Sequence, residues 1–228
     1  MVRAGRGCTA RGSSRGLVEV PGRLNVLIVG VGGQGVLTLG SLIAWASTLS
    51  GIDVTVAETH GLSQRGGSLA VHVRLNNKDA PLIPVGEADH VIALEALEAL
   101  RYLSYARRGA VLVVNRLRLP PPLTSPPGLD VIEGALRKAF DGLVYVYDAD
   151  NEAKQVAGST LYSNTLLLGI SVAVDERLRR VVSPAMVEEA INTLFAGRAA
   201  EANLRAFNQG LKIGFSLAGS RGAGQAAR

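Results

Sequence analysis

The chain has 228 residues, of which 47% are hydrophobic and 19% are charged, so it can bury the core of one α/β domain. No stretch reaches the roughly 18 uncharged apolar residues of a membrane span, and residues 1–21 contain no apolar run of the signal-peptide kind. The net charge of +5 arises at the ends, because residues 1–22 hold four arginines against one glutamate and residues 217–228 hold two arginines and no acid.

The body of the chain, residues 23–216, therefore contains equal numbers of acidic and basic side chains. A nucleic-acid-binding domain concentrates basic charge on its folded face, so we expect no nucleic-acid partner, no membrane partner and a cytoplasmic location. The Gly-, Ala-, Ser- and Arg-rich ends, 1–22 and 217–228, predict disordered tails around a single domain, 23–216. The only cysteine, Cys8, lies in the first tail, so the chain cannot form a disulfide, a zinc site or an iron–sulfur cluster alone.

The first predicted elements are a strand and a long helix. The continuous apolar run 24–29 is typical of a strand buried on both faces of a sheet. An apolar helix over 36–50, ended by Gly51, and a strand over 52–58 complete a βαβ unit.

The next segment departs from a doubly wound sheet. Only residues 59–67 separate the strand 52–58 from a new alternating strand over 68–75. A crossover between parallel strands needs at least about 10–12 residues. The strand 68–75 is therefore expected to run antiparallel to its predecessor.

The remainder alternates between strands and helices and then becomes helical. The expected elements are a strand 90–94, a helix 95–108, a strand 110–115, an extended proline-rich loop 116–128, a helix 130–140, a strand 143–148, and helices 151–157, 160–174, 184–195 and 201–215. The fold class is therefore α/β, a Rossmann-like three-layer domain with a mixed, mostly parallel sheet and a helical C-terminal region.

A glycine-rich turn joins the first strand to the first helix. Gly30, Gly32 and Gly35 match G-x-G-x-x-G in its strand–helix context, with Gly33 and Gln34 between them. Glycine lets the backbone approach a ligand closely, and the free N–H groups and dipole of the following helix favour an anion. We interpret this turn as a phosphate or diphosphate cradle, with a tight turn that binds no ligand as the alternative.

One residue supports NAD as the ligand of this turn. Glu58 ends the second predicted strand, close to the position roughly 20 residues on where a ribose-binding acid belongs. The antiparallel strand 68–75 argues against NAD, because the mononucleotide half is then incomplete. The polar stretch after Glu58 is a second candidate for ligand or partner contacts, and its candidate residues are Glu58, Thr59, His60, Gln64, Arg65, Gly66, Gly67 and Ser68.

Two pairs of segments resemble known proteins. VGVGGQGVLTLGSLIAWA (29–46) and AETHGLSQRGGSLAVHVRL (57–75) are similar to the gamma-type domain of 2-oxoacid:ferredoxin oxidoreductases. ADHVIALEALEALRYL (88–103) and NLRAFNQGLKIG (203–214) most resemble the beta subunit of indolepyruvate:ferredoxin oxidoreductase. The resemblance covers about 24–215, everything except the tails.

The resemblance implies one role in a shared reaction. This family converts a 2-oxoacid, CoA and oxidised ferredoxin into acyl-CoA, CO₂ and reduced ferredoxin, using thiamine diphosphate with Mg²⁺ and 4Fe–4S clusters. The chain has neither a Gly-Asp-Gly…Asn diphosphate–magnesium segment nor cluster cysteines. We therefore expect a large alpha subunit to hold these cofactors, in a heterodimer or heterotetramer, with ferredoxin as a further partner and no metal on this chain.

The small subunit would then contribute to oxidative decarboxylation of aryl 2-oxoacids without being active alone. The alternatives are the gamma subunit of an enzyme for pyruvate, 2-oxoglutarate or branched-chain acids, a free-standing NAD(P)-dependent oxidoreductase, or a nucleotide-binding regulatory module. No candidate residue forms a nucleophile–base pair with an orienting third group, so we expect no catalytic residue on this chain.

Within this frame Arg65 is the residue expected to contact an anion, such as a CoA phosphate or a substrate carboxylate. Its guanidinium is a fixed charged fork, and Gly66 and Gly67 allow close approach; an exposed arginine without a ligand is the alternative. Glu58 binds a ligand hydroxyl or pairs with Arg65. His60 orients a carbonyl or is structural.

Four further polar residues have simpler expected roles. Gln34 bonds the ligand or caps its helix. His72 alternates with apolar residues on a strand and is expected to be a satisfied structural histidine. Glu95 and Glu98 are expected to compensate the dipole at a helix start.

Overall fold

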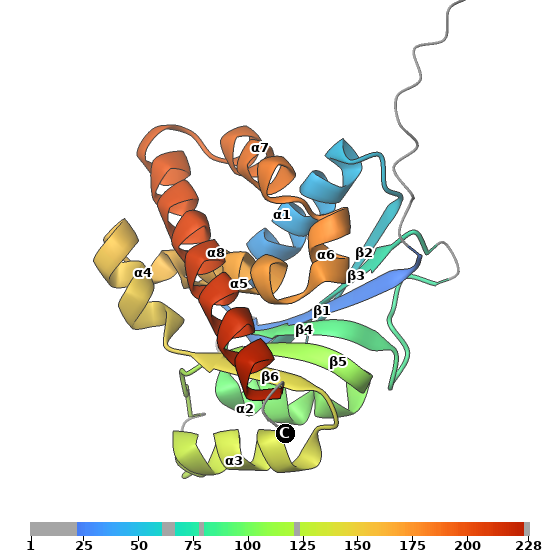
Figure 1. Cartoon of the computed structure of the whole chain (residues 1–228), viewed down its shortest axis with the longest axis vertical. Helices are drawn as coiled ribbons and strands as arrows, with labels where there is room; N and C mark the ends of the chain where they lie inside the picture. The colour runs from blue at the N-terminus through green and yellow to red at the C-terminus, as the bar shows by residue number, and fades with distance from the viewer. Residues whose placement is uncertain (1–21, 61–66, 78–79, 121–123, 226–228) are drawn as a thin grey trace, which may run out of the picture.

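The computed structural model describes residues 22–60, 67–77, 80–120 and 124–225, and it has one mixed sheet between two layers of helices (Figure 1). Its strands are β1 (Leu24–Val31), β2 (Val54–His60), β3 (Ser68–Leu75), β4 (Ala88–Ala93), β5 (Ala106–Asn115) and β6 (Leu143–Tyr147). The spatial order is β2-β3-β1-β4-β5-β6, and β3 is antiparallel to both of its neighbours while the other pairs are parallel. The predicted α/β class is confirmed.

The antiparallel strand β3 lies between β1 and β2. Val71 of β3 pairs with Ile28 of β1 on one side and with Glu58 of β2 on the other. The expected direction of 68–75 is therefore confirmed. β1 and β2 run parallel and are joined through α1, as the predicted βαβ unit requires, but β3 lies between them. The crossover through α1 places β2 one strand position away from β1. The chain then returns after β2, and β3 occupies the position between them.

Helices cover both faces of the sheet (Figure 1). They are α1 (Val36–Leu49), α2 (Ala96–Arg101), α3 (Leu129–Ala139), α4 (Ala149–Ala157), α5 (Ser163–Val174), α6 (Glu176–Val181), α7 (Pro184–Leu194) and α8 (Gly197–Gln225), with 3-10 turns at Leu103–Tyr105 and Thr160–Tyr162. Alternate residues of β1 face two separate cores. Ile28 packs with α1, α5 and α8, whereas Leu27 packs with α2 and α3.

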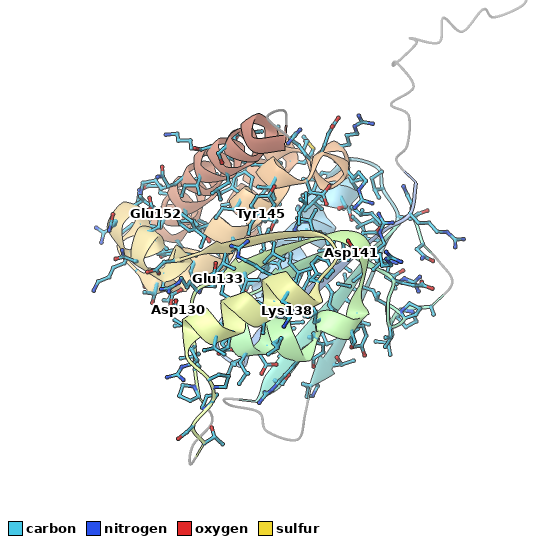
Figure 2. The ribbon with its side chains drawn as sticks, turned by 60° about the horizontal axis from the view of Figure 1, so that its bottom comes forward. Asp130, Glu133, Lys138, Asp141, Tyr145 and Glu152 are labelled. Carbon is cyan, nitrogen blue, oxygen red and sulfur yellow. The ribbon has the colours of Figure 1, made fainter. Side chains whose placement is uncertain are left out.

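The helix α3 is held to the sheet by its apolar face. Ile132 and Leu136 are fully buried, while Asp130 and Lys138 project from the outer side (Figure 2). Asp130 pairs with Arg116 at 2.6 Å, but exposed ion pairs contribute only about 0–1 kcal/mol each. The two buried aliphatic side chains therefore fix this helix.

The predicted helix 95–108 is wrong in its second half. The helix ends at Arg101, and β5 already begins at Ala106, with Gly109 inside the strand at φ 72°. The contacts that fix this segment are distant in sequence: Arg107 pairs with Asp89 at 2.6 Å, and the Gly109 N–H donates to the Asp141 carbonyl at 2.6 Å. The hydrophobic periodicity of residues 95–108 gives no indication of these contacts.

Two differences concern the C-terminal region. The last helix was expected to end near Phe215, with 217–228 as a tail, but α8 continues to Gln225. Leu217 packs against the core, and the Arg179 guanidinium lies 5.4 Å from the Phe215 ring centroid, so tertiary contacts extend the helix. The helix α6 was not predicted; Asp175 caps it by accepting the N–H groups of residues 177 and 178. The tail 1–22 lies outside the described residues except for Gly22.

No single helix in the described ranges is both long and apolar enough to span a membrane. One pair, Ala149–Ala157 with Thr160–Val174, has that length and composition only when taken together across a bend of 116°. Ten residues of α5 are buried inside the protein.

Candidate functional site

The glycine turn between β1 and α1 has the backbone geometry that only glycine adopts without strain. Gly33 has φ 101° and Gly35 has φ 79°. Gly35 is the N-cap of α1, and no side chain caps that helix start. A Cβ atom on Gly33 would meet nothing within 4 Å, so the turn is open on that side. Backbone N–H groups at an uncapped helix start can bind an anion.

The Gln34 side chain braces this turn through two hydrogen bonds to the backbone. Its Oε1 accepts the Val31 N–H at 2.7 Å, and its Nε2 donates to the Leu94 carbonyl at the end of β4 at 3.0 Å. A Cβ on Gly30 would lie 2.8 Å from this Oε1, so Gly30 is a packing glycine within β1. Gln34 does not cap α1, so that expected role is wrong, whereas its expected ligand contact stays a prediction because Gln34 lines the main cavity.

The turn opens onto the main cavity, of about 520 Å³, at the carboxyl edge of the sheet. Its lining residues are Gly33, Gln34, Gly35, Thr38, Leu117, Leu119, Asp150, Thr160, Leu161, Tyr162, Ser163, Asn164, Phe195, Ala199 and Asn203. The helix after β1 covers one face of the sheet, and the helix after its neighbour β4 covers the other. Ligands of open α/β sheets bind in the crevice at such a reversal.

Buried amides from the C-terminal helices form one wall of the main cavity. Asn164 donates from Nδ2 to the Gly35 carbonyl at 3.3 Å. Thr165 Oγ1 donates to Asn203 Oδ1 at 2.7 Å, and Asn203 Nδ2 donates to the Ala199 carbonyl at 2.9 Å. This wall ties the glycine turn to α5 and α8. Sequence reasoning missed it, although polar residues just before the apolar run 166–170 were a usable signal.

Two other side chains fix the opposite wall. Asn115, at the end of β5, donates from Nδ2 to Asp150 Oδ1 at 2.9 Å and accepts the Ala149 N–H at 3.0 Å. The buried Glu95 carboxylate accepts the Leu119 N–H at 2.9 Å, which holds Leu119 in the wall. Burial raises the pKa of Glu95, and its hydrogen bonds from backbone N–H groups oppose that rise. Glu95 is therefore an anchor for the loop and not only a dipole-compensating charge.

The second cavity, of about 200 Å³, lies on the other side of the glycine turn. It is lined by Gly32, Leu37, Glu58, His60, Gly67, Ser68 and Leu69. The Gly32 N–H donates to the Gly67 carbonyl at 3.0 Å. The structure thus divides the predicted residues between two cavities, with Gly33, Gln34 and Gly35 on the main one.

The remaining candidates have varied environments. Ser68 donates to the buried Glu98 carboxylate at 2.5 Å, so Glu98 is a hydrogen-bond acceptor as well as a charge at a helix start. Thr59 Oγ1 lies 3.4 Å from His72 Nε2. Gln64, Arg65 and Gly66 lie outside the described residues, so their predicted roles, and the Glu58–Arg65 pair, stay predictions.

The strand order argues against a dinucleotide in the Rossmann manner. In that arrangement the ribose-binding acid ends the strand beside β1. Here β3 occupies that place, and Glu58 belongs to the edge strand β2 and lines only the second cavity. The carboxylate that favoured NAD is therefore not beside the turn's main cavity.

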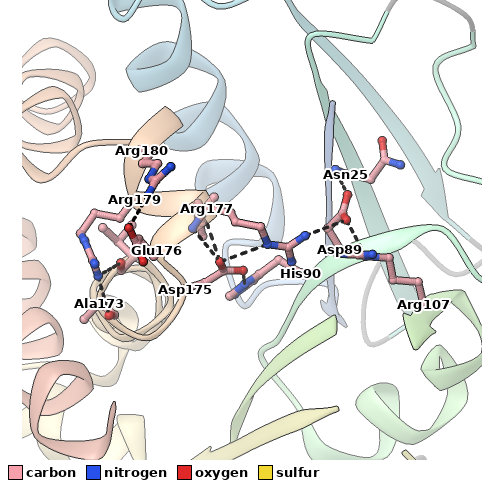
Figure 3. A network of polar contacts seen from close by, with 12 residues as sticks. Asn25, Asp89, His90, Arg107, Ala173, Asp175, Glu176, Arg177, Arg179 and Arg180 are labelled. Atoms are coloured by element: carbon pink, nitrogen blue, oxygen red, sulfur yellow. Dashed lines mark hydrogen bonds and ion pairs between the residues drawn. The ribbon is translucent and has the colours of Figure 1, made fainter. Parts of the chain in front are cut away.

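A network of polar side chains lies at the amino edge of the sheet, opposite the main cavity (Figure 3). His90 of β4 is fully buried, and its Nδ1 lies 3.0 Å from Asp175 Oδ2. Asp89 accepts the Asn25 N–H at 2.8 Å and pairs with Arg107. Burial alone raises the pKa of Asp175, but the hydrogen bond and charge of His90 and the charge of Arg177 lower it overall. This network joins α6 to the sheet.

His72 is the satisfied histidine that the sequence predicted. Its Nδ1 accepts the Ile83 N–H at 3.1 Å, and its ring packs edge-on against Tyr105. Burial first, and then the charge of Arg74, lower the pKa of His72. The fold thus favours the neutral imidazole.

These shifts predict that acid destabilises the protein in two stages. Because the folded-state pKa of His72 is lowered, stability is lost as the pH falls below its ordinary pKa of about 6.5. The lowered pKa of Asp175 stabilises the fold above the ordinary aspartate pKa of about 3.9, and that part is lost at still lower pH. We expect the urea midpoint to fall between pH 7 and 5 in the natural chain and to change less in His72→Asn, whose Oδ1 can still accept the Ile83 N–H. If the urea midpoints of the natural chain and of His72→Asn change equally with pH, the loss of stability does not come from His72.

The comparisons with known proteins agree with this geometry. The family model described as pyruvate ferredoxin/flavodoxin oxidoreductase matches residues 25–213. An indolepyruvate oxidoreductase subunit IorB from Archaeoglobus fulgidus is 39% identical over 201 residues, covering 86% of this chain and 96% of its own length. A second IorB, from Pyrococcus horikoshii, is 34% identical and covers 82% of this chain and 94% of its own length.

Solved structures share the fold. A keto/oxoacid ferredoxin oxidoreductase gamma subunit from Geobacter sulfurreducens has a TM-score of 0.64 at 24% identity, covering 85% of this chain and 99% of its own. A 2-oxoglutarate:ferredoxin oxidoreductase from Magnetococcus marinus has a TM-score of 0.63 at 18% identity, over 85% of this chain but 31% of its own. The same fold thus makes up nearly a whole subunit chain in one protein and part of a longer polypeptide in another. From the family match and the identity along nearly its whole described length, the chain belongs to the pyruvate ferredoxin/flavodoxin oxidoreductase family.

Proposed function

We propose that the chain is the small, cluster-free subunit of an indolepyruvate oxidoreductase and acts only beside a large subunit. The observation that carries this is the 39% identity to an IorB subunit along 86% of the chain. The large subunit would hold thiamine diphosphate, Mg²⁺ and iron–sulfur clusters, and the reaction would be CoA-dependent oxidative decarboxylation of aryl 2-oxoacids with ferredoxin as acceptor. The cytoplasmic location expected from the composition is part of the same proposal.

The main cavity supports an accessory role. Among the described residues that line it, only Asp150 is acidic and none is basic. The uncapped start of α1 and the open side of Gly33 fit one phosphate or carboxylate held by backbone N–H groups. They do not neutralise a whole diphosphate, and within the described residues no group of three His, Cys, Asp or Glu could hold a metal ion. The residues present therefore suit part of a CoA or 2-oxoacid site, completed by the partner.

The test is reconstitution with the cognate large subunit. The purified complex should contain iron and thiamine diphosphate, and with CoA and ferredoxin it should oxidise indolepyruvate and phenylpyruvate faster than pyruvate, 2-oxoglutarate or branched-chain acids. If the complex prefers pyruvate, 2-oxoglutarate or a branched-chain acid, the proposed substrate is wrong but the proposed subunit role stands. Oxidation or reduction of NAD(P)(H) by the isolated chain would contradict the proposal.

Arg65 provides a second test on a residue predicted from sequence. If its guanidinium contacts an anion of CoA or the oxoacid, Arg65→Ala should lower kcat/KM about 10–100-fold, since hydrogen bonds to charged groups contribute about 1.5–3 kcal/mol. Assembly should be unchanged. Arg180→Ala, which removes an exposed arginine paired with Glu176 on α6, is the matched control. Equal kinetics in both variants would remove Arg65 from the site.

A further inference from the structure

Three leucines are exposed around the glycine turn, and we call them the apolar rim. Leu119 and Leu161 are 43% and 71% exposed and line the main cavity, and Leu37 is 43% exposed and lines the second cavity. They come from the loop after β5, the 3-10 turn before α5 and the first turn of α1. Segments distant in sequence thus place apolar side chains at one edge of the sheet.

This convergence differs from the scattered exposed leucines found on any protein surface. Glu95 accepts the Leu119 N–H at 2.9 Å, so the loop that carries Leu119 is anchored by a buried carboxylate. Ser159 accepts the Leu161 N–H at 3.2 Å, which fixes the turn that carries the most exposed member. Exposed apolar groups held beside a concave polar site have the composition of an interface core.

The main cavity is incomplete as a reaction site. Asp150 is its one charged lining residue, and Asn115 already donates a hydrogen bond to that carboxylate at 2.9 Å. Among the described residues, the positive potential available to an anion comes from backbone N–H groups at the start of α1. Carboxylate or phosphate groups of a substrate therefore need cationic side chains that the described lining of this cavity does not supply.

We propose that the apolar rim is where the large subunit docks, closing the main cavity from the carboxyl edge of the sheet. This inference rests on the proposed function, which supplies the partner. The docking face of that partner carries apolar side chains over Leu119 and Leu161 and cationic groups that point into the cavity. The anion then lies between those cations and the start of α1.

The chain has a rival apolar surface on α1. Trp45 and Leu49 are 42% and 43% exposed, and they line neither of the two cavities. A partner bound there would leave the mouth of the main cavity open. The rival surface therefore provides the discriminating variant.

The experiment measures the Kd between the full-length chain and the cognate large subunit with its cofactors. Leu119→Glu and Leu161→Glu introduce a charge into the rim and should each raise Kd about tenfold or more. Val131→Glu is the matched control, because Val131 is 63% exposed on α3 at the other face of the sheet. Trp45→Glu tests the rival surface. Thermal unfolding of each variant shows that it is folded, and Leu161→Gln repeats the test without a charge.

Weaker binding by both rim variants, with Val131→Glu and Trp45→Glu unchanged, is the expected result. If the natural chain binds but the rim variants bind equally well, or if Trp45→Glu alone abolishes binding, the docking surface is overturned and the proposed function stands. If the natural chain does not bind the large subunit at all, the proposed function fails, and the rim assignment fails with it.

Discussion

Gly210→Ala is expected to destabilise the protein by about 3 kcal/mol or more, at the upper end of single-residue effects. Gly210 lies where α8 crosses α5, and a Cβ there would collide with the Leu166 carbonyl oxygen and lie 3.1 Å from the Gly169 Cα. Gly169 and Gly214 are equally crowded by the facing helix. Backbone atoms cannot move aside as a flexible side chain can, so the two helices must separate. Helices α5 and α8 both contribute residues to the core cluster that contains Phe207.

Gly134→Ala is the matched control. Gly134 lies inside α3, and a Cβ there would meet nothing within 4 Å. Alanine favours a helix interior over glycine by about 1 kcal/mol, so this variant should be slightly more stable than the natural chain. Urea unfolding of the two variants measures the difference. Similar midpoints for both would mean that the helix crossing tolerates a methyl group and that the close approach is not required.

Gly35→Ala is expected to reduce turnover of the assembled complex more than Gly33→Ala does. Both residues have positive φ values, so alanine at either one costs about 1–3 kcal/mol of backbone strain. Only at Gly35 would the new methyl group collide with the Asn164 amide; at Gly33 it meets nothing within 4 Å. The Gly35 variant must therefore displace Asn164 from the wall of the main cavity.

Comparison of these two variants separates the effect of displacing Asn164 in the cavity wall from the effect of backbone strain. We expect kcat/KM for the 2-oxoacid to fall by about tenfold or more beyond the loss in Gly33→Ala, since a small displacement of positioning groups has effects of this order. Binding of the large subunit should persist in both variants. If Gly35→Ala and Gly33→Ala have the same kinetics, Asn164 has no part in the site and the turn is only a tight connection.

Local sequence predicted the elements whose signal is contained within a few residues. The apolar run 24–29, the helix that follows it and the direction of 68–75 were readable because buried strands, glycine stops and short connections impose strict limits on the backbone. The pairing of this strand with both β1 and β2 was not readable, because sheet order depends on contacts between distant segments.

The candidate site was predictable only on its N-terminal side. The glycine turn has a pattern with a direct physical meaning, so the sequence predicted its tight geometry, and its role as an anion cradle stays a prediction. The wall made by Asn164, Thr165 and Asn203 has only the weaker signal of polar residues before the apolar run 166–170. It forms when Asn164 donates to the Gly35 carbonyl and Thr165 bonds to Asn203 of α8, contacts between segments distant in sequence. The bracing by Gln34 could likewise not be predicted, since its acceptor is the carbonyl of Leu94, just after β4 and 60 residues away in sequence.

The two walls of the main cavity have a consequence for how the protein is made. The glycine turn is synthesised early, but Asn203 lies on α8, so the enclosed space does not exist until α8 has been synthesised and has packed. Because domains generally fold as units, a nascent chain that stops before α8 presents a half-built crevice to its surroundings. The order in which the segments are synthesised therefore sets the order in which the two walls can form.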